Sequence, residues 1–186
     1  MQARCRHPER VVLGHPFNPP HLIPLVELSG APWTDPAAIE RAREVYRSIG
    51  QVPVTVLKEI EGFVLNRLQG ALLAEAFRLV SEGYVTPQDL DLTVSEGLGL
   101  RWSFMGPFET IDLNAPGGVA DYAARFGPLL GAITAEQAPY DFDAPTVGKV
   151  AAERRAALPL PGMEERSAWR DRRLMALLAH KRKQER

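Results

Sequence analysis

The chain has 186 residues, of which 45% are hydrophobic and 24% are charged, and its formal net charge at pH 7 is -1. This composition excludes extended disorder, and the charge gives no reason to expect a nucleic-acid partner, because phosphate binding normally needs a basic excess. The sequence has no signal-peptide core and no apolar run long enough to cross a membrane, and its single Cys5 cannot form an internal disulfide. We therefore expect a cytoplasmic protein without a membrane partner. The scattered histidines have no metal-ligand spacing, so no metal is expected.

The first ten residues have little apolar periodicity and indicate the frayed end of a helix or a linker. The apolar run Val11–Leu13 predicts a buried strand that stops at Gly14. His15 then lies at the end of a strand, where open α/β sheets collect their ligands. Position alone favours a hydrogen-bonded turn histidine over a catalytic one.

Glu27 changes this balance, because it lies inside the apolar run Ile23–Leu28, where a buried carboxylate needs a partner. His15 and Glu27 suggest a dyad in which the imidazole takes a proton from a substrate hydroxyl. The carboxylate would fix the imidazole tautomer and stabilise the imidazolium. A simple hairpin that pairs His15 with Ile23 would leave Glu27 roughly 13 Å away along the strand. The dyad therefore requires a different arrangement of the two segments.

The next elements complete a small α/β unit. Thr34 and Asp35 offer an N-cap, and Pro36 suits the first position of an amphipathic helix that runs to Gly50. Residues 52–57 are rich in β-formers and predict another strand. Strand, strand, helix, strand is the pattern of an α/β remnant of a Rossmann-like doubly wound sheet, which we assign to residues 1–60.

From Gly62 onwards the pattern is helical, and we assign residues 61–186 to an all-α C-terminal domain. Residues 63–82 are apolar around most of the helix circumference, which predicts a helix buried among others. Asn66 lies near its start, where the helix dipole favours developing negative charge. A core amide with satisfied hydrogen bonds is an equal alternative. Gly70, one turn later, would leave room beside Asn66.

Thr86 and Asp89 form a capping pattern that predicts a short helix ending near Gly97, followed by a turn-rich loop over residues 99–107. In this loop, the guanidinium of Arg101 could bind the carboxylate of a sugar acid. A solvated arginine is the more ordinary interpretation. Further helices are predicted at residues 107–113, at 119–133 with an interruption at Gly127 and Pro128, at 145–158, and at 163–183 after a linker.

Several separated motifs resemble the 3-hydroxyacyl-CoA dehydrogenase family. They are GHPFNPP at 14–20, LVEL at 25–28, GFVLNRLQ at 62–69 and MGPFE at 105–109. Two longer strings, VTPQDLDLTVSEGLGLRW at 85–102 and WRDRRLMAL at 169–177, resemble its lambda-crystallin branch, the L-gulonate 3-dehydrogenases. The likeness runs from about Val11 almost to the C-terminus.

The resemblance implies NAD as cofactor and oxidation of the 3-hydroxyl of an L-gulonate-like hydroxy acid, with a homodimer formed through the helical domain. A 3-hydroxyacyl-CoA such as 3-hydroxybutyryl-CoA, from fatty acid metabolism, is the alternative substrate. An alternative of another class is a non-catalytic, crystallin-like structural or dimerisation protein. By resemblance, His15, Glu27 and Asn66 are catalytic, Asn66 also lies beside the nicotinamide, and Asn18 and Arg101 bind substrate.

Two features of the family are missing from this sequence. No G-x-G-x-x-G dinucleotide loop occurs among its fifteen glycines, since Trp102 follows Gly97 and Gly99 where the third glycine should stand. The serine that the family places upstream of its histidine is also unmatched. We expect a fragment of a longer gene product, with loss of the cofactor domain as the alternative; whether the chain is active by itself stays open.

Overall fold

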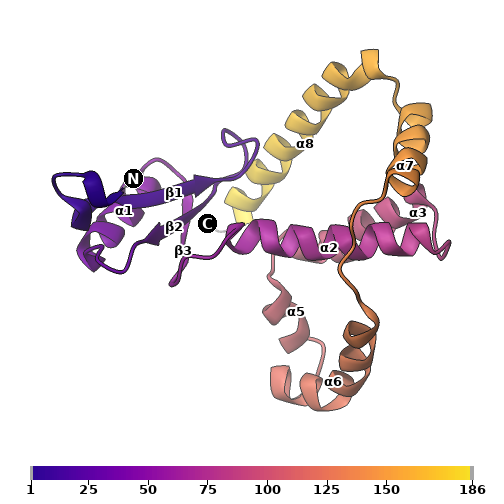
Figure 1. Cartoon of the computed structure of the whole chain (residues 1–186), viewed down its shortest axis with the longest axis horizontal. Helices are drawn as coiled ribbons and strands as arrows, with labels where there is room; N and C mark the ends of the chain where they lie inside the picture. The colour runs from indigo at the N-terminus through magenta and orange to yellow at the C-terminus, as the bar shows by residue number, and fades with distance from the viewer. Residues whose placement is uncertain (1, 185–186) are drawn as a thin grey trace. The chain divides into compact units, whose positions relative to one another are not determined.

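The structure is a computed structural model that describes residues 2–184 (Figure 1). The chain divides into two compact units. The first comprises residues 1–70 together with 170–177, and the second comprises residues 71–169 together with 178–186. The division falls within a helix rather than at a linker. The assignment of residues 1–60 and 61–186 to separate functional domains therefore stays a prediction.

The first unit is built on a three-stranded sheet. Its elements are two 3-10 turns (Gln2–Arg4 and Pro8–Arg10), β1 (Val12–Pro16), β2 (Leu25–Gly30), α1 (Pro36–Ser48) and β3 (Val52–Thr55). Strand β2 lies in the centre, antiparallel to β1 and parallel to β3. Helix α1 contacts all three strands, as can be followed in Figure 1. The buried side chains of Val26 and Leu28 on β2 form the centre of this core.

The pairing of β1 with β2 differs from a simple hairpin. The ladder places His15 directly opposite Glu27 and continues to Pro16 opposite Val26. The predicted end of the strand at Gly14 was therefore wrong, whereas the expectation that the dyad needs a pairing other than His15 with Ile23 is confirmed. Residues 17–24 form a connection long enough to shift the register, which removes the distance objection to the dyad.

The N-terminal segment is tied to the sheet rather than frayed. The side-chain nitrogen of Gln2 lies 2.9 Å from the Pro8 carbonyl oxygen and 3.0 Å from Thr34 Oγ1. Thr34 Oγ1 donates in turn to the carbonyl of Val11 at 3.1 Å. The cap of α1 is Asp35, whose side chain accepts a hydrogen bond from the Ala37 amide at 2.9 Å. Thr34 and Asp35 were both predicted as possible N-caps, and Asp35 is the N-cap residue.

The rest of the chain is helical, which confirms the predicted fold class. The elements are α2 (Phe63–Ser81), α3 (Pro87–Leu92), a π-helical turn (Thr93–Leu98), α4 (Gly99–Trp102), α5 (Pro107–Asp112), α6 (Gly118–Glu136), α7 (Ala144–Ala157), a 3-10 turn (Leu160–Gly162) and α8 (Met163–Gln184). Thr86 caps α3 by accepting a hydrogen bond from the Asp89 amide, as its capping pattern predicts.

Two of the predicted helix ends were wrong. Helical structure continues from α3 through residue 102, so Arg101 lies on α4 instead of in a loop. Gly99 directly follows the π-helical turn and donates its amide to the carbonyl oxygen of Val94, and a Cβ atom at this position would stand 2.9 Å from that oxygen. Helix α6 passes through Gly127 and Pro128 without interruption. A proline removes one hydrogen bond of the helix, and those on either side of it hold this helix together.

Helix α2 was predicted to be buried among other helices, but most of its residues are not buried in this structure. Its buried residues are Ala76 and Val80, whereas Leu68 is 60% exposed. Within residues 2–184, no helix is long and apolar enough to span a membrane. The same residues contain no group of three or more histidine, cysteine or acidic side chains that could hold a metal ion.

Candidate active site

His15 and Glu27 meet across the first two strands. Nδ1 of His15 lies 3.1 Å from Oε2 of Glu27. The Glu27 side chain is only 2% exposed, whereas that of His15 is 31% exposed. Because a carboxylate can only accept, Nδ1 carries the hydrogen and donates it to Glu27. In the neutral imidazole this leaves the lone pair on Nε2.

The second carboxylate oxygen of Glu27 binds the start of α2. Oε1 accepts hydrogen bonds from the backbone amides of Val64 at 2.9 Å and Leu65 at 3.0 Å. The first amides of a helix have no partner within that helix, and a negative charge there interacts favourably with the helix dipole. Glu27 therefore caps α2 from a neighbouring strand, and this explains how a carboxylate can be buried in an apolar run.

The backbone just before these amides has an unusual conformation. Gly62 has φ of 79° and Phe63 has φ of 53°, so two successive residues lie in the left-handed region. The Phe63 ring then stacks on the imidazole of His15, with ring centroids 4.8 Å apart and an interplanar angle of 18°. His15 is thus held at Nδ1 by Glu27 and on one face by Phe63.

The geometry supports proton transfer at Nε2 of His15. Among the hydrogen bonds of residues 2–184, none involves this atom. A partly exposed imidazole whose tautomer is fixed by a carboxylate can accept a proton from a hydroxyl group placed against Nε2. The arrangement is that of a general base with its orienting partner.

Among the described residues of the first unit, neither Asn18 nor Asn66 forms a hydrogen bond with this dyad. Asn66 lies in the first turn of α2, next to the amides bound by Glu27, and its side chain is exposed. Asn18 is exposed in the connection between β1 and β2, directly before a cis peptide bond to Pro19. Arg101 is exposed on α4 in the second unit. Their proposed roles rest on the sequence.

Sequence reasoning missed Phe63 and the two amides of α2. The signal for the amides was the glycine at the start of an apolar helix pattern, because Gly62 marks a turn from which a helix begins. Nothing in the sequence paired this turn with Glu27, which is 37 residues away from Val64. The stacking of Phe63 on His15 follows from that same contact.

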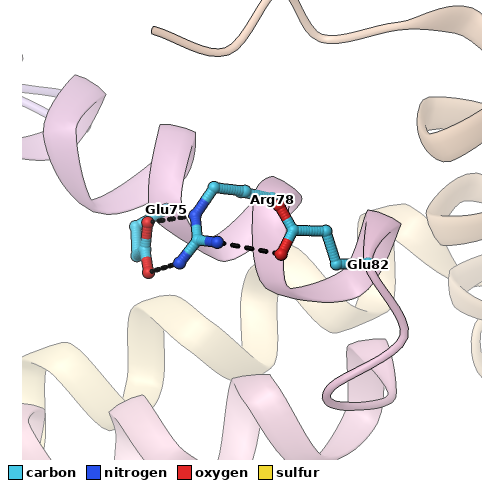
Figure 2. Close-up of polar contacts among 3 residues, drawn as sticks. All are labelled: Glu75, Arg78 and Glu82. Carbon is cyan, nitrogen blue, oxygen red and sulfur yellow. Dashed lines mark hydrogen bonds and ion pairs between the residues drawn. The ribbon is translucent and has the colours of Figure 1, made fainter. Parts of the chain in front are cut away.

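A second cluster of charge lies on α2 in the other unit. Figure 2 shows Arg78 between Glu75 and Glu82, with hydrogen bonds of 2.6 and 2.9 Å to Glu75 and of 2.9 Å to Glu82. The hydrogen bonds from Arg78 lower the pKa of Glu75 below its usual value, although partial burial opposes the shift. The i, i+3 and i, i+4 spacing is typical of ion pairs on a helix surface, and all three charged groups are paired with one another, so we assign them no role in proton transfer.

Comparison with known proteins places these residues in a family. Residues 1–60 match the family model described as 3-hydroxyacyl-CoA dehydrogenase, NAD binding domain, and residues 62–140 match the corresponding C-terminal domain. A lambda-crystallin homolog from Bos taurus is 44% identical over 178 residues, which are 94% of this chain and 55% of the relative. An L-carnitine dehydrogenase from Pseudomonas putida is 47% identical over 125 residues, which are 67% of this chain and 39% of the relative.

Solved structures agree with this placement. The chain matches the crystal structure of 5-formyl-3-hydroxy-2-methylpyridine 4-carboxylic acid (FHMPC) 5-dehydrogenase, which is described as an NAD+-dependent dismutase. The TM-score is 0.76 and the sequence identity is 32%, and the match covers 99% of this chain and 59% of that one. A 3-hydroxyacyl-CoA dehydrogenase from Archaeoglobus fulgidus shares the fold, with a TM-score of 0.61, 24% identity and coverage of 96% and 62%. The chain spans about half the length of the lambda-crystallin homologs it matches.

NAD is the cofactor that the matched domain binds. The residues of this chain are suited to the nicotinamide end of NAD and not to its pyrophosphate. The sequence has no G-x-G-x-x-G loop, so no residue of this chain is assigned to the pyrophosphate. The partly exposed His15 and the exposed Asn66 are polar groups suited to the reacting end of the cofactor and to the substrate.

Proposed function

Because this chain belongs to the 3-hydroxyacyl-CoA dehydrogenase family, we propose that it carries the proton-transfer half of an NAD-dependent dehydrogenase acting on the 3-hydroxyl of a small hydroxy acid. The observation that carries the proposal is the pairing of Nδ1 of His15 with the buried Glu27, which leaves Nε2 free to act as the base. Asn66 completes the proposed catalytic set.

The chemistry follows from this geometry. As the substrate alcohol becomes a ketone, its hydroxyl proton passes to Nε2 of His15 and its carbon loses a hydride. NAD, when bound, supplies the carbon that accepts this hydride. Glu27 stabilises the imidazolium that forms, because its charge lies beside Nδ1. Asn66, at the positive end of α2, would orient the reacting oxygen or the nicotinamide.

The proposed substrate is an L-gulonate-like hydroxy acid. The names of two relatives support a small acid, because L-carnitine is a 3-hydroxy acid and FHMPC is a carboxylic acid. Asn18 and Arg101 would bind the substrate, with the Arg101 guanidinium paired to the carboxylate. A 3-hydroxyacyl-CoA is the second candidate, favoured by the name of the matched family.

We also propose the domain roles and the setting. Residues 1–60 would be the remnant of the cofactor domain, and residues 61–186 the helical domain for substrate binding and dimerisation. The protein would be a cytoplasmic homodimer. A non-catalytic, crystallin-like role is the alternative of another class, since a lambda-crystallin from Oryctolagus cuniculus is 55% identical over 120 residues. A purely structural protein has no use for a base held by a buried carboxylate.

The test is a comparison of turnover for three substrates, namely L-gulonate, L-carnitine and 3-hydroxybutyryl-CoA, each with NAD. It uses both the 186-residue chain and a version extended upstream to include any encoded glycine-rich loop. We expect turnover by the extended version with a hydroxy acid. His15→Asn should lower kcat by about a hundredfold to ten-thousandfold while the fold persists.

His7→Asn is the matched control, because His7 is an exposed histidine paired with Glu9 and has no place in the proposed site. Equal turnover in the two histidine variants would contradict the assignment of His15. Arg101→Ala should raise KM for the acid substrate, and an unchanged KM would remove Arg101 from the site. Absence of turnover with every substrate in both versions would favour the structural alternative.

A further inference from the structure

The stacking of Phe63 on His15 is not explained by the dyad alone. The two rings are nearly parallel, with centroids 4.8 Å apart. Phe63 reaches this position with φ of 53°, in a region that side chains with a Cβ atom rarely adopt. Such a conformation persists only where the surrounding contacts fix it, and it is common at functional sites.

Those surrounding contacts are on either side of Phe63. Its own amide donates to the carbonyl of Ile60 at 3.1 Å, which closes the preceding turn. The next two amides, of Val64 and Leu65, donate to Glu27. The carboxylate that orients His15 therefore also fixes the backbone from which the Phe63 ring projects. The ring and the carboxylate reach the imidazole from one connected piece of structure.

The chemical consequence concerns the protonated imidazole. The face of a phenyl ring carries partial negative charge, and a cation within about 6 Å of its centre is attracted to it. During substrate oxidation, His15 changes from a neutral ring to a cation. Glu27 interacts with this charge at the edge of the ring, and Phe63 is placed to interact with it on the face.

We propose that Phe63 is a positioning residue that fixes the plane of the His15 imidazole by stacking and interacts favourably with the imidazolium that forms during oxidation. The kinetic part of this inference rests on the proposed dehydrogenase function. The structural part does not, because the stacked pair lies entirely within the chain. The two parts can therefore be tested separately.

The structural part is tested by NMR on the 186-residue chain. Protons of an imidazole that lies over a phenyl ring are shifted upfield by its ring current. We expect the Cε1 and Cδ2 protons of His15 to move downfield in Phe63→Leu and to stay near their wild-type positions in Phe63→Tyr. Phe108→Leu is the control, because Phe108 is 77% exposed in the second unit. Unmoved His15 protons in Phe63→Leu would overturn the proposal.

The kinetic part is tested in the version extended upstream. We expect Phe63→Leu to lower kcat by about threefold to tenfold with little change in KM, the range that a lost cation–π contact of moderate strength implies. Phe63→Tyr, which keeps an aromatic face, should restore turnover. A loss in Phe63→Tyr as large as in Phe63→Leu, or wild-type kcat in both, would overturn the role in catalysis.

The failures can be distinguished. If neither version of the wild-type protein oxidises any substrate, the proposed function fails, while the NMR comparison still decides whether Phe63 holds His15. If Phe63→Leu does not fold, its amide spectrum loses dispersion. Phe63→Asn then takes its place, because asparagine tolerates the left-handed conformation and lacks the ring.

Discussion

Among residues 2–184, Glu27 has three hydrogen-bond partners, and each of its two carboxylate oxygens binds different ones. Oε2 accepts from Nδ1 of His15, and Oε1 accepts from the amides of Val64 and Leu65. The first contact belongs to the proposed chemistry and the other two to the stability of α2. Substitutions at this one residue can separate the two roles.

Glu27→Gln should keep the fold and lose activity. The glutamine oxygen can still accept from the two amides, so we expect the free energy of unfolding to change by less than about 1 kcal/mol. Its NH2 group, however, would donate to Nδ1 of His15 and move the ring hydrogen to Nε2. The base would then be in the wrong tautomer, and kcat should fall by about a thousandfold or more. Steady-state kinetics and urea unfolding measure the two effects.

Glu27→Ala should impair both properties. Two amides at the start of α2 would lose their acceptor, and we expect the free energy of unfolding to fall by about 2 kcal/mol. Glu59→Ala is the control, since Glu59 is an exposed carboxylate of the same unit. An equal loss of stability in the Gln and Ala variants would contradict the capping role.

At the level of single residues, the sequence predicted the pairing of His15 with Glu27 but not the contacts around the pair. Glu27 stood out because a carboxylate inside an apolar run needs a partner. Phe63 did not stand out, because a phenylalanine at the start of an apolar helix pattern predicts only burial. The proposed role of Phe63 depends on its positive φ angle and on its stacking with His15, which lies 48 residues earlier in the chain. Neither feature has a local sequence signal.

Among the helices, α7 offers a test of capping by pH. Asp143 accepts a hydrogen bond from the Thr146 amide at 2.9 Å and another from the hydroxyl of Tyr140. These hydrogen bonds, that of Tyr140 first, lower the pKa of Asp143 below the ordinary value of 3.8. A lowered pKa means that the ionised carboxylate stabilises the folded state above pH 3.8, and that this stabilisation is lost as the pH falls through the lower folded-state value.

We therefore expect Asp143→Ala to unfold at a lower urea concentration than the wild type at pH 7, with the difference shrinking towards pH 3. Circular dichroism at both pH values measures it. Asp141→Ala is the matched control, a neighbouring aspartate whose side chain has no hydrogen bond among the described residues. A difference that stays constant from pH 7 to pH 3 would contradict the role of the charge.

The network on α2 should contribute little to stability. Arg78 and its two partners lie at i, i+3 and i, i+4 spacing and are partly open to solvent (Figure 2). Arg78→Met keeps the apolar part of the side chain, so we expect the free energy of unfolding to change little. The pKa of Glu75 should rise towards its usual value, which carboxyl-carbon NMR can follow. An unchanged Glu75 titration would show that Arg78 is not the main cause of its shift.

The predicted helix ends were right where a capping side chain and a proline favoured the same position, and wrong where a glycine or proline interrupted a helical pattern. Asp35 before Pro36 and Thr86 before Pro87 gave correct helix starts, because a capping side chain and a proline both favour the same position. We predicted a helix end at Gly97 and an interruption at Pro128, but helical structure continues through both positions. The β1–β2 register could not be predicted, because residues 17–24 leave several pairings open and the choice depends on packing against α1.

For the whole molecule, exposed apolar side chains carry the main prediction. Leu57 in the first unit is 95% exposed, and Leu100 and Leu113 in the second are 60% and 69% exposed. Contiguous exposed apolar surface is typical of sites where other protein binds, and we expect further protein to cover residues such as these. We expect light scattering to give a dimer or larger species for the version extended upstream. A strict monomer would contradict the homodimer.

The three partners of Glu27 also imply an order of assembly. His15 is 12 residues away along the chain, whereas Val64 and Leu65 are 37 and 38 residues away. Closing the shorter loop costs less entropy, so the β1–β2 hairpin can form before α2 docks. During refolding, pulse-labelled hydrogen exchange should protect the hairpin amides earlier than those of Val64 and Leu65. His15 and Glu27 would then come together first, and the amides of Val64 and Leu65 would bind Glu27 afterwards.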